Sequence, residues 1–323
     1  MTEEMESTLN SKTVMVTGGA GFVGSHLVDR LMNMGAKVTV VDNLVTGSRE
    51  NLNQALQNAT CKLIKADASE DVSVYTDENF HYIFHLASPA SPVDFEKTPK
   101  EIYKVNAYGT EHLCEFASTI GARLLFASTS EAYGDPLEHP QKETYFGNVN
   151  PIGPRTSYDE SKRFGEMVVS TFTKQDNLDA RTVRIFNTYG PRMRENGGRV
   201  IPTFVSQALG GNDITVHGNG SQTRSFCYVD DLVEYLLQVM ISDKCRGEVV
   251  NLGNPDEYSM QEVAEKVKQI AGSESDIVNI DPRDEDPARR QPDISKVVEL
   301  VGYEPKIGFE EGLGKIIDWA KNR

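Results

Sequence analysis

Short apolar segments alternate with amphipathic helical segments along the first 190 residues, and this alternation limits the possible folds. The β-rich run at 12–17 is followed by a glycine-rich turn, by apolar residues at helical spacing, and by a second run at 37–42. Further apolar runs lie at 61–66, 82–86, 123–128 and 181–186, with helical stretches near 97–119 and 158–175. Strands that are apolar throughout and separated by helices are typical of a parallel sheet with both faces covered. The sequence therefore predicts a doubly wound, Rossmann-type α/β domain over residues 11–190.

The chain changes character after residue 190, where proline and glycine become frequent and the elements become shorter. Helices are expected at 201–209 and 231–240, short strands at 214–217 and 224–228, and a further helix after the capping box Ser259-x-x-Glu262. We expect a smaller mixed α/β lobe over 191–323 that mainly binds the substrate, with some segments able to return to the first domain. Residues 1–10 lack apolar periodicity and are predicted to form a loose N-terminal segment.

The charge balance limits the kinds of partner that the protein can have. The chain carries 33 Lys and Arg against 48 Asp and Glu, for a net charge of −15. Sequence-independent binding to nucleic acid or anionic lipid requires clustered positive charge.

The sequence also bears on the compartment. No apolar run reaches the roughly 18–20 residues of a membrane span, and the acidic N-terminus differs from a signal peptide. The four cysteines lack a C-x-x-C spacing. We therefore expect a cytoplasmic protein with free thiols that binds neither nucleic acid nor membranes.

A glycine motif lies between the first strand and the first helix of the predicted domain. Gly18, Gly21 and Gly24 have the spacing G-x-x-G-x-x-G, which permits a tight turn and exposes the N–H groups of a helix N-terminus to a diphosphate. Asp42 ends the second strand, where a carboxylate can bind ribose hydroxyls and would repel a 2′-phosphate, so the pattern favours NAD over NADP. The alternative is a glycine-rich turn and a surface carboxylate. The predicted cofactor site also includes Phe22, Val23, Asn43, Asp67, Leu86, Ala87 and Ser88.

Two polar groups of residues point to acid–base chemistry. Tyr158 and Lys162 stand four residues apart and share one helix face, so the ammonium could lower the pKa of the phenol from about 10 toward use as a base. Thr129, Ser130 and Glu131 follow the fifth strand and should reach the same crevice, where a hydroxyl can bind a substrate oxygen and the carboxylate can act in proton transfer. The alternatives are an ordinary amphipathic helix and a polar turn.

Two other polar residue types are less specific. Asn106 could form hydrogen bonds in the core, or it could orient the Lys162 ammonium through a water molecule; it is included in the cofactor site. The six histidines show no metal-ligand spacing, so no metal is predicted.

The glycine motif, the Tyr158-x-x-x-Lys162 pair and Asn187 together resemble the extended short-chain dehydrogenase/reductase family, whose members act on nucleotide sugars. The segments 86–92, 128–135, 150–155, 184–192 and 220–224 are similar to the branch of that family that decarboxylates UDP-glucuronate. This resemblance implies oxidation of the sugar at C4 by NAD, loss of CO₂, and return of the hydride to give UDP-xylose, with Tyr158 as the base. It implies that Glu131 takes part in reprotonation at C5.

The alternatives are another nucleotide-sugar epimerase or 4,6-dehydratase, or a non-catalytic dinucleotide sensor. The dehydratases carry an Asp where this chain has Ser130, and epimerases usually lack a Glu at the position of Glu131.

The resemblance also implies a substrate site and an assembly. Arginine suits bidentate contact with phosphate or carboxylate, although any one arginine could instead be a solvated surface charge. The helices expected near 97–119 and 158–175 carry more apolar residues than one face of the sheet can cover. In relatives, two such helices from each subunit form a four-helix interface, so the resemblance implies a homodimer. The alternative is that all of these residues belong to the core. Segments that face the nucleotide diphosphate in relatives contain Asn187, Arg192, Arg199 and Arg224, and Arg289 and Arg290 match a C-lobe segment of the decarboxylases, so one or both are expected to bind substrate. Further candidates for the sugar carboxylate are Ser88, Ser91 and Lys104.

Overall fold

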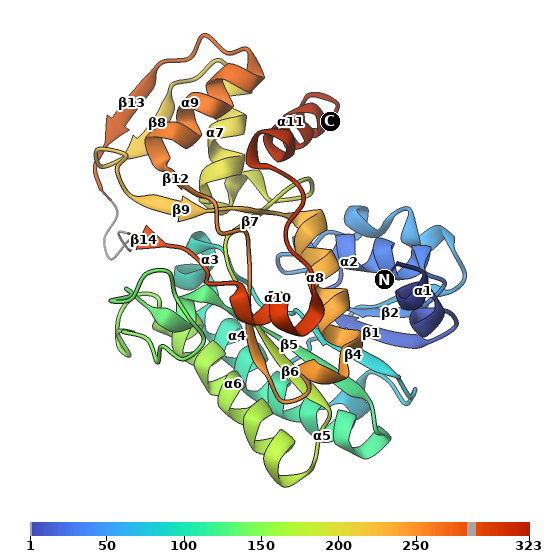
Figure 1. Cartoon of the computed structure of the whole chain (residues 1–323). Coiled ribbons are helices and arrows are strands. Elements are labelled where there is room, and N and C mark those ends of the chain that lie inside the picture. The colour runs from blue at the N-terminus through green and yellow to red at the C-terminus, as the bar shows by residue number, and fades with distance from the viewer. Residues whose placement is uncertain (1, 283–288) are drawn as a thin grey trace.

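The structure is a computed structural model of the chain that describes residues 2–282 and 289–323. Its centre is a seven-stranded parallel sheet, which confirms the predicted doubly wound fold (Figure 1). Six strands lie within two residues of their predicted bounds. The seventh strand, contributed from beyond residue 190, was not predicted. In spatial order the strands are β11 (Val249–Leu252), β6 (Ala180–Ile185), β5 (Arg123–Thr129), β4 (Tyr82–His85), β1 (Thr13–Thr17), β2 (Lys37–Val41) and β3 (Cys61–Ile64).

Helices cover both faces of this sheet. Val14 and Val16 of β1 belong to the core cluster that includes α2 (Phe22–Asn33) and α8 (Val229–Ile241), whereas Met15 belongs to the opposite cluster. This alternation is the period-2 pattern of a strand buried on both sides. The opposite face is covered by α5 (Thr110–Ile120) and α6 (Thr156–Gln175), with α4 (Pro99–Lys104) joined to α5 through a π-helical turn at Val105–Gly109.

The N-terminus is ordered as α1 (Thr2–Leu9), so the prediction of a loose segment at 1–10 is wrong for residues 2–9; residue 1 lies outside the described residues. Met5 and Leu9 are fully buried, and the helix packs beside α8. A helix this short is marginal in isolation, so its order comes from the tertiary contacts of these two side chains.

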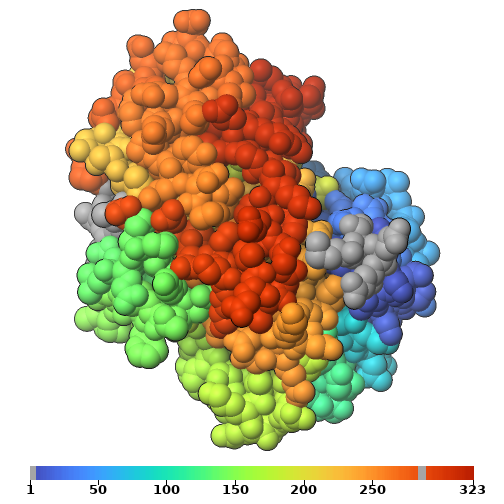
Figure 2. Space-filling view, in the orientation of Figure 1, coloured from blue at the N-terminus to red at the C-terminus, as the bar shows by residue number. Residues whose placement is uncertain are grey.

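The smaller lobe contains α7 (Val200–Leu209), α9 (Met260–Ala271), α11 (Phe309–Lys321) and short paired strands. Ser259 and Glu262 form the predicted capping box at the start of α9. α8, β11 and α10 (Ser295–Val301) lie against the first domain, and the C-terminal segment runs from the lobe across that domain (Figure 2). The paired strands are β8 (Ile214–His217) with β13 (Ile277–Ile280), β9 (Thr223–Ser225) with β12 (Glu257–Ser259) and β14 (Arg289–Arg290), and β7 (Thr188–Tyr189) with β10 (Cys227–Tyr228).

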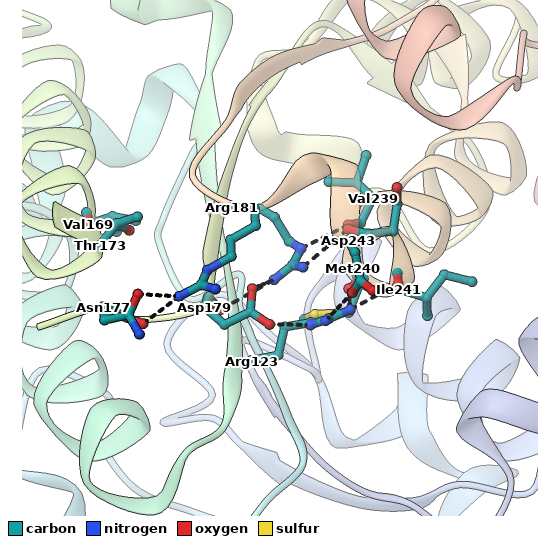
Figure 3. Close-up of polar contacts among 12 residues, drawn as sticks. Arg123, Val169, Thr173, Asn177, Asp179, Arg181, Val239, Met240, Ile241 and Asp243 are labelled. Atoms are coloured by element: carbon teal, nitrogen blue, oxygen red, sulfur yellow. Dashed lines mark hydrogen bonds and ion pairs between the residues drawn. The ribbon is translucent and has the colours of Figure 1, made fainter.

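Two arginines at the amino ends of β5 and β6 hold the carboxyl end of α8 (Figure 3). The fully buried Arg181 donates from Nε to the Val239 carbonyl at 3.0 Å and pairs with Asp179 at 2.8 Å. Arg123 donates to the carbonyls of Met240 and Ile241 at 3.1 and 2.9 Å. These carbonyls end a helix and need donors from outside it. These two arginines, called the arginine clasp below, therefore fix the end of α8 at the amino ends of the sheet strands.

No helix within residues 2–282 and 289–323 is both long and apolar enough to span a membrane.

Candidate active site

A cavity of about 820 Å³ lies at the carboxyl ends of the sheet strands and contains most of the predicted cofactor residues. Gly18 has a left-handed φ of +73°, and a Cβ there would lie 2.7 Å from the Ala87 backbone. At Gly24 a Cβ would lie 2.2 Å from the Gly18 carbonyl oxygen, so α2 approaches the first strand only because glycine stands here. Lining residues from the prediction are Gly18, Gly21, Phe22, Val23, Gly24, Asp42, Asn43, Asp67, Leu86, Ala87 and Ser88.

The electrostatics of this part of the cavity fit a dinucleotide. Gly21 caps α2 with extended backbone, and the first residues of the helix line the cavity, so N–H groups and the positive end of the helix dipole are available to a diphosphate. The Asp42 carboxylate accepts hydrogen bonds from the N–H groups of Ala20 and Leu44 at 3.0 and 2.8 Å. Burial raises the pKa of Asp42 from its ordinary value, and the two N–H groups oppose that rise. A buried carboxylate oriented in this way suits the hydroxyls of a ribose.

The predicted catalytic residues line the same cavity. β5 ends at Thr129, a 3₁₀ helix at Ser130–Tyr133 carries Glu131, and α6 carries Tyr158 and Lys162. The Thr129 hydroxyl accepts the Glu131 N–H at 3.2 Å and acts to lower the pKa of the Tyr158 phenol. Thr129 therefore lies where the end of β5, the 3₁₀ helix and the start of α6 meet at the cavity.

Burial dominates the electrostatics of Tyr158 and Lys162. Burial raises the pKa of Tyr158 to about 12, while Thr129 and Arg199 act to lower it. The Lys162 ammonium donates to the Ala127 carbonyl at 2.7 Å and lies 5.9 Å from the Tyr158 ring centroid. Burial lowers the pKa of Lys162 itself to about 7. Burial therefore dominates the pKa of Tyr158, the Lys162 ammonium is turned toward a backbone carbonyl, and the lowering of the Tyr158 pKa by Lys162 stays a prediction.

Glu131 is enclosed by guanidinium groups. Arg290, from β14, donates to its two carboxylate oxygens at 2.6 and 2.7 Å, and Arg155 lies 2.5 Å from one of them. Burial acts to raise the pKa of Glu131, but the positive charges of Arg290 and Arg155 outweigh it and lower the pKa to about 2. The carboxylate is therefore ionised.

Sequence reasoning missed two members of this cluster. Arg155 lies three residues before Tyr158 and also approaches Asp159, with 3.6 Å between Nε and the carboxylate. Burial and the charge of Glu131 raise the pKa of Asp159 to about 7. The helical position of Arg155, one turn before Tyr158, was a signal that could have identified it.

The predicted substrate residues separate into two groups. Among the residues that the structure describes, Lys104 and Arg289 line neither cavity: Lys104 is exposed on α4, and Arg289 pairs with Glu257 at 3.3 Å. Arg192 lines the large cavity but pairs with Asp29 of α2 at 2.7 Å. The other predicted residues line the large cavity or an adjoining one of about 160 Å³: Ser91, Asn187, Arg199, Arg224 and Arg290.

Asn106 is buried in the π-helical turn and donates to the Ser161 hydroxyl at 3.0 Å. Its side-chain oxygen Oδ1 has no hydrogen-bond partner among the described residues, and the side chain lies outside the lining of both cavities. The structure thus gives Asn106 a core hydrogen bond, and its relation to Lys162 through water stays a prediction.

Arg194, which sequence reasoning did not single out, also borders the large cavity. Arg194 pairs with Asp94 of α3 (Pro92–Lys97) at 2.9 Å, while Arg192 on the same segment pairs with α2. Ion pairs to two helices of the first domain therefore hold this segment against the cavity. No group of three or more potential metal-ligating side chains occurs in the part of the chain that the structure describes.

Comparisons with known proteins agree with this geometry. A family model described as the NAD dependent epimerase/dehydratase family matches residues 14–253. UDP-glucuronic acid decarboxylase 1 of Xenopus tropicalis is 47% identical over 315 residues, which are 98% of this chain and 73% of that protein. UDP-glucuronic acid decarboxylase 6 of Arabidopsis thaliana is 47% identical over 93% of this chain and 86% of its own length.

Solved structures of nucleotide-sugar enzymes have the same fold. UDP-glucose 4-epimerase of Thermotoga maritima, solved with UDP-glucose, superposes with a TM-score of 0.87 at 31% identity, covering 96% of this chain and 99% of that one. A UDP-glucuronic acid 4-epimerase variant from Bacillus cereus, solved with NAD and a fluorinated UDP-glucuronic acid, gives 0.86 at 25% identity, with coverages of 96% and 99%. The chain therefore belongs to the NAD dependent epimerase/dehydratase family of extended short-chain dehydrogenases/reductases.

Proposed function

We propose that this protein is an NAD-dependent decarboxylase that converts UDP-glucuronate to UDP-xylose through a 4-keto sugar. The observation that carries the proposal is the position of Glu131, held by Arg290 and Arg155 beside the Thr129–Tyr158 pair. The site thus combines a phenol for a sugar hydroxyl with guanidinium groups for an anionic sugar. The 47% identity to enzymes named UDP-glucuronic acid decarboxylase supports the same reaction.

The cofactor would lie along the glycine turn with its diphosphate at the start of α2 and a ribose at Asp42. When bound, NAD supplies the acceptor for the hydride from C4 and returns that hydride at the end of the cycle. The protein's part is to hold both ligands in one orientation. Close backbone packing at Gly18 and Gly24 and the hydrogen bond from Lys162 to the Ala127 carbonyl keep the walls of the site in place.

Tyr158 is the residue that we assign to remove the proton of the sugar 4-hydroxyl, with Thr129 holding the same oxygen. The resulting ketone is β to the sugar carboxylate, so CO₂ leaves while the electron pair is delocalised onto the C4 oxygen. C5 then gains a proton that comes from solvent water, so one proton is consumed for each CO₂ released. Because Glu131 is ionised, it does not supply this proton from its own carboxyl group, and we assign it to accept a hydrogen bond from the donor water and orient it toward C5.

The guanidinium groups around Glu131 are the binding site that we assign to the sugar carboxylate. The buried Nε of Arg290 has no hydrogen-bond acceptor among the described residues, and the partly buried Arg199 lines both cavities. A buried unpaired donor is costly, so a ligand that supplies an acceptor there gains binding free energy. This arrangement also gives a protein of charge −15 a local positive site for an anion.

The hypotheses of an epimerase or a dehydratase have less support. Ser130 stands where the dehydratase pattern has an Asp that would protonate a departing hydroxyl. Glu131, at a position where epimerases usually lack a Glu, is engaged with two arginines.

We further propose a homodimer and a cytoplasmic location. Large apolar side chains are exposed on α4, the π-helical turn and α6, at Tyr103, Tyr108, Phe164 and Met167. A second copy that covers them would remove this apolar area from water. The four cysteines are free and buried, which suits a reducing compartment.

The reaction class is tested with UDP-glucuronate labelled at the carboxyl carbon. The protein with NAD⁺ should release labelled CO₂, and retention of all label in the nucleotide sugar would sink the proposal. Tyr158→Phe is the matched control, because it removes only the hydroxyl. This variant should release no label while binding NAD⁺ with nearly the wild-type affinity, measured by calorimetry.

A further inference from the structure

Asn251 of β11 is a fully buried amide that joins three separate segments. Its carbonyl oxygen accepts from the Tyr133 hydroxyl at 2.8 Å. Its amide nitrogen donates to the Gln141 carbonyl at 3.0 Å and to the Asp293 carbonyl at 3.1 Å. Both ends of the side chain are therefore used, and each partner belongs to a different part of the chain.

Gln141 completes the junction from the loop that follows the 3₁₀ helix. It is fully buried and pairs in parallel with Pro292. Its backbone N–H donates to the Gln291 carbonyl, its side-chain oxygen accepts the Gln291 N–H, and its carbonyl accepts the Asp293 N–H, each at 2.9 Å. Residues 291–293 are thus fixed to the first domain, where the C-terminal segment passes the loop (Figure 2).

These contacts lie next to Glu131 and Arg290, the ion pair of the proposed active site. Tyr133 is in the same 3₁₀ helix as Glu131, two residues further on, and Gln291 directly follows Arg290. Glu131 and Arg290 are 159 positions apart in the sequence, so no local structure sets their distance. Asn251 contacts one hydroxyl beside Glu131 and one carbonyl close to Arg290, and it lies outside the lining of both cavities.

We propose that Asn251, with Gln141, is a positioning residue that holds Arg290 in bidentate register with Glu131. The proposal rests on the proposed decarboxylation, in which this pair acts after oxidation at C4. A bidentate guanidinium–carboxylate pair depends on planar alignment, and displacements of about 1 Å in an active site reduce rates by up to about 100-fold. Asn251 acts only through its neighbours, because it touches neither Glu131 nor the cavity.

The substitution Asn251→Asp separates positioning from general stability. It keeps the shape and the acceptor for Tyr133, but it replaces the N–H donors with an oxygen that faces two carbonyls. We expect the rate of CO₂ release to fall about 10- to 100-fold. Oxidation at C4 depends on Thr129 and Tyr158, so it should persist, and NADH should accumulate during turnover to a larger fraction than in the wild type.

Two further variants keep the test decisive if Asn251→Asp folds poorly. Tyr133→Phe removes one hydroxyl and should give the same changes with smaller size. Gln238→Leu removes another buried amide, which donates to Glu234 one turn earlier in α8 at 2.9 Å, and it should leave CO₂ release and the NADH fraction unchanged. Thermal unfolding of each variant reports the general loss of stability separately.

Hydrogen–deuterium exchange provides a readout without the reaction. The amides of Gln291 and Asp293 should exchange faster in Asn251→Asp than in the wild type, and Gln238→Leu should leave them unchanged. The proposal is overturned if exchange at 291–293 is unchanged, or if CO₂ release and NADH formation fall together. A wild-type protein that releases no CO₂ would instead overturn the proposed function, and the exchange measurement would still decide whether Asn251 holds the segment.

Discussion

At the scale of single residues, most of the site residues predicted from the sequence line the two cavities, but their charge states could not be predicted. Glu131, Tyr158 and Lys162 were predicted to share one crevice, and they line one cavity. The pKa of Glu131 depends on burial and on the charges of Arg290 and Arg155, whereas burial is the largest influence on the pKa values of Tyr158 and Lys162. Spacing along one helix predicts which side chains share a face, but it does not predict which way an ammonium turns or how far a phenol is desolvated.

Arg155 is the residue whose removal should change the pH dependence most simply. Its positive charge favours the Glu131 carboxylate, so Arg155→Met disfavours ionisation and raises the pKa of Glu131. Activity that requires the carboxylate should then be lost at a higher pH as the solution is acidified, and the acid limb of kcat should move upward by at least about one pH unit. The measurement is a pH profile of kcat. Arg246→Met removes an exposed positive charge that contacts Asn177, and it should leave the profile in place. Coincident acid limbs for Arg155→Met and the wild type would contradict the role of Arg155.

At the scale of elements, the strands and helices of the first domain followed from apolar periodicity, and those formed by long-range contacts did not. β11 is only four residues long and joins the sheet from beyond residue 190, and α1 depends on two buried side chains. Neither has a local pattern that distinguishes it from a loop. The capping box of α9 was predictable because its hydrogen bonds are made within four residues.

The arginine clasp on α8 should contribute to stability without affecting catalysis, since it lies at the amino ends of the strands and the cavity lies at their carboxyl ends. Arg181→Leu removes donors to the Val239 and Ser242 carbonyls and the pair with Asp179. We expect the free energy of unfolding to fall by about 2 kcal/mol or more, because buried helix-end carbonyls lose their donors. Urea denaturation measures this loss, with Arg246→Leu as an exposed control. The account of the clasp fails if Arg181→Leu unfolds at the wild-type urea concentration, or if kcat falls while stability is retained.

At the scale of the whole molecule, the charge of −15 describes the surface and not the cavity, where arginines from both parts of the chain converge on one carboxylate. The sequence predicted the class of ligand through motifs. It could not predict that β14 of the smaller lobe brings Arg290 to the first domain, because that contact depends on the junction of 291–293 with Gln141.

The proposed homodimer is a prediction at the same scale. Phe164 and Met167 of α6 are 46% and 50% exposed, so replacing both with Glu should place charges in an apolar interface and yield monomers. Sedimentation equilibrium should give twice the chain mass of 35.8 kDa for the wild type and the single mass for the double variant. Val74→Glu, at a 66% exposed apolar residue on another element, should stay dimeric. A wild-type protein that sediments as a monomer would refute the dimer.

The proposed reaction combines oxidation at C4, loss of CO₂ and protonation at C5 in one site. The most direct measurement is NMR of the nucleotide sugar formed from UDP-glucuronate and NAD⁺ in D₂O. We expect UDP-xylose with one solvent-derived deuterium at C5 and with hydrogen retained at C4, because the hydride removed from C4 returns to it. A hexose product that keeps the carboxylate, or a pentose without deuterium at C5, would contradict it.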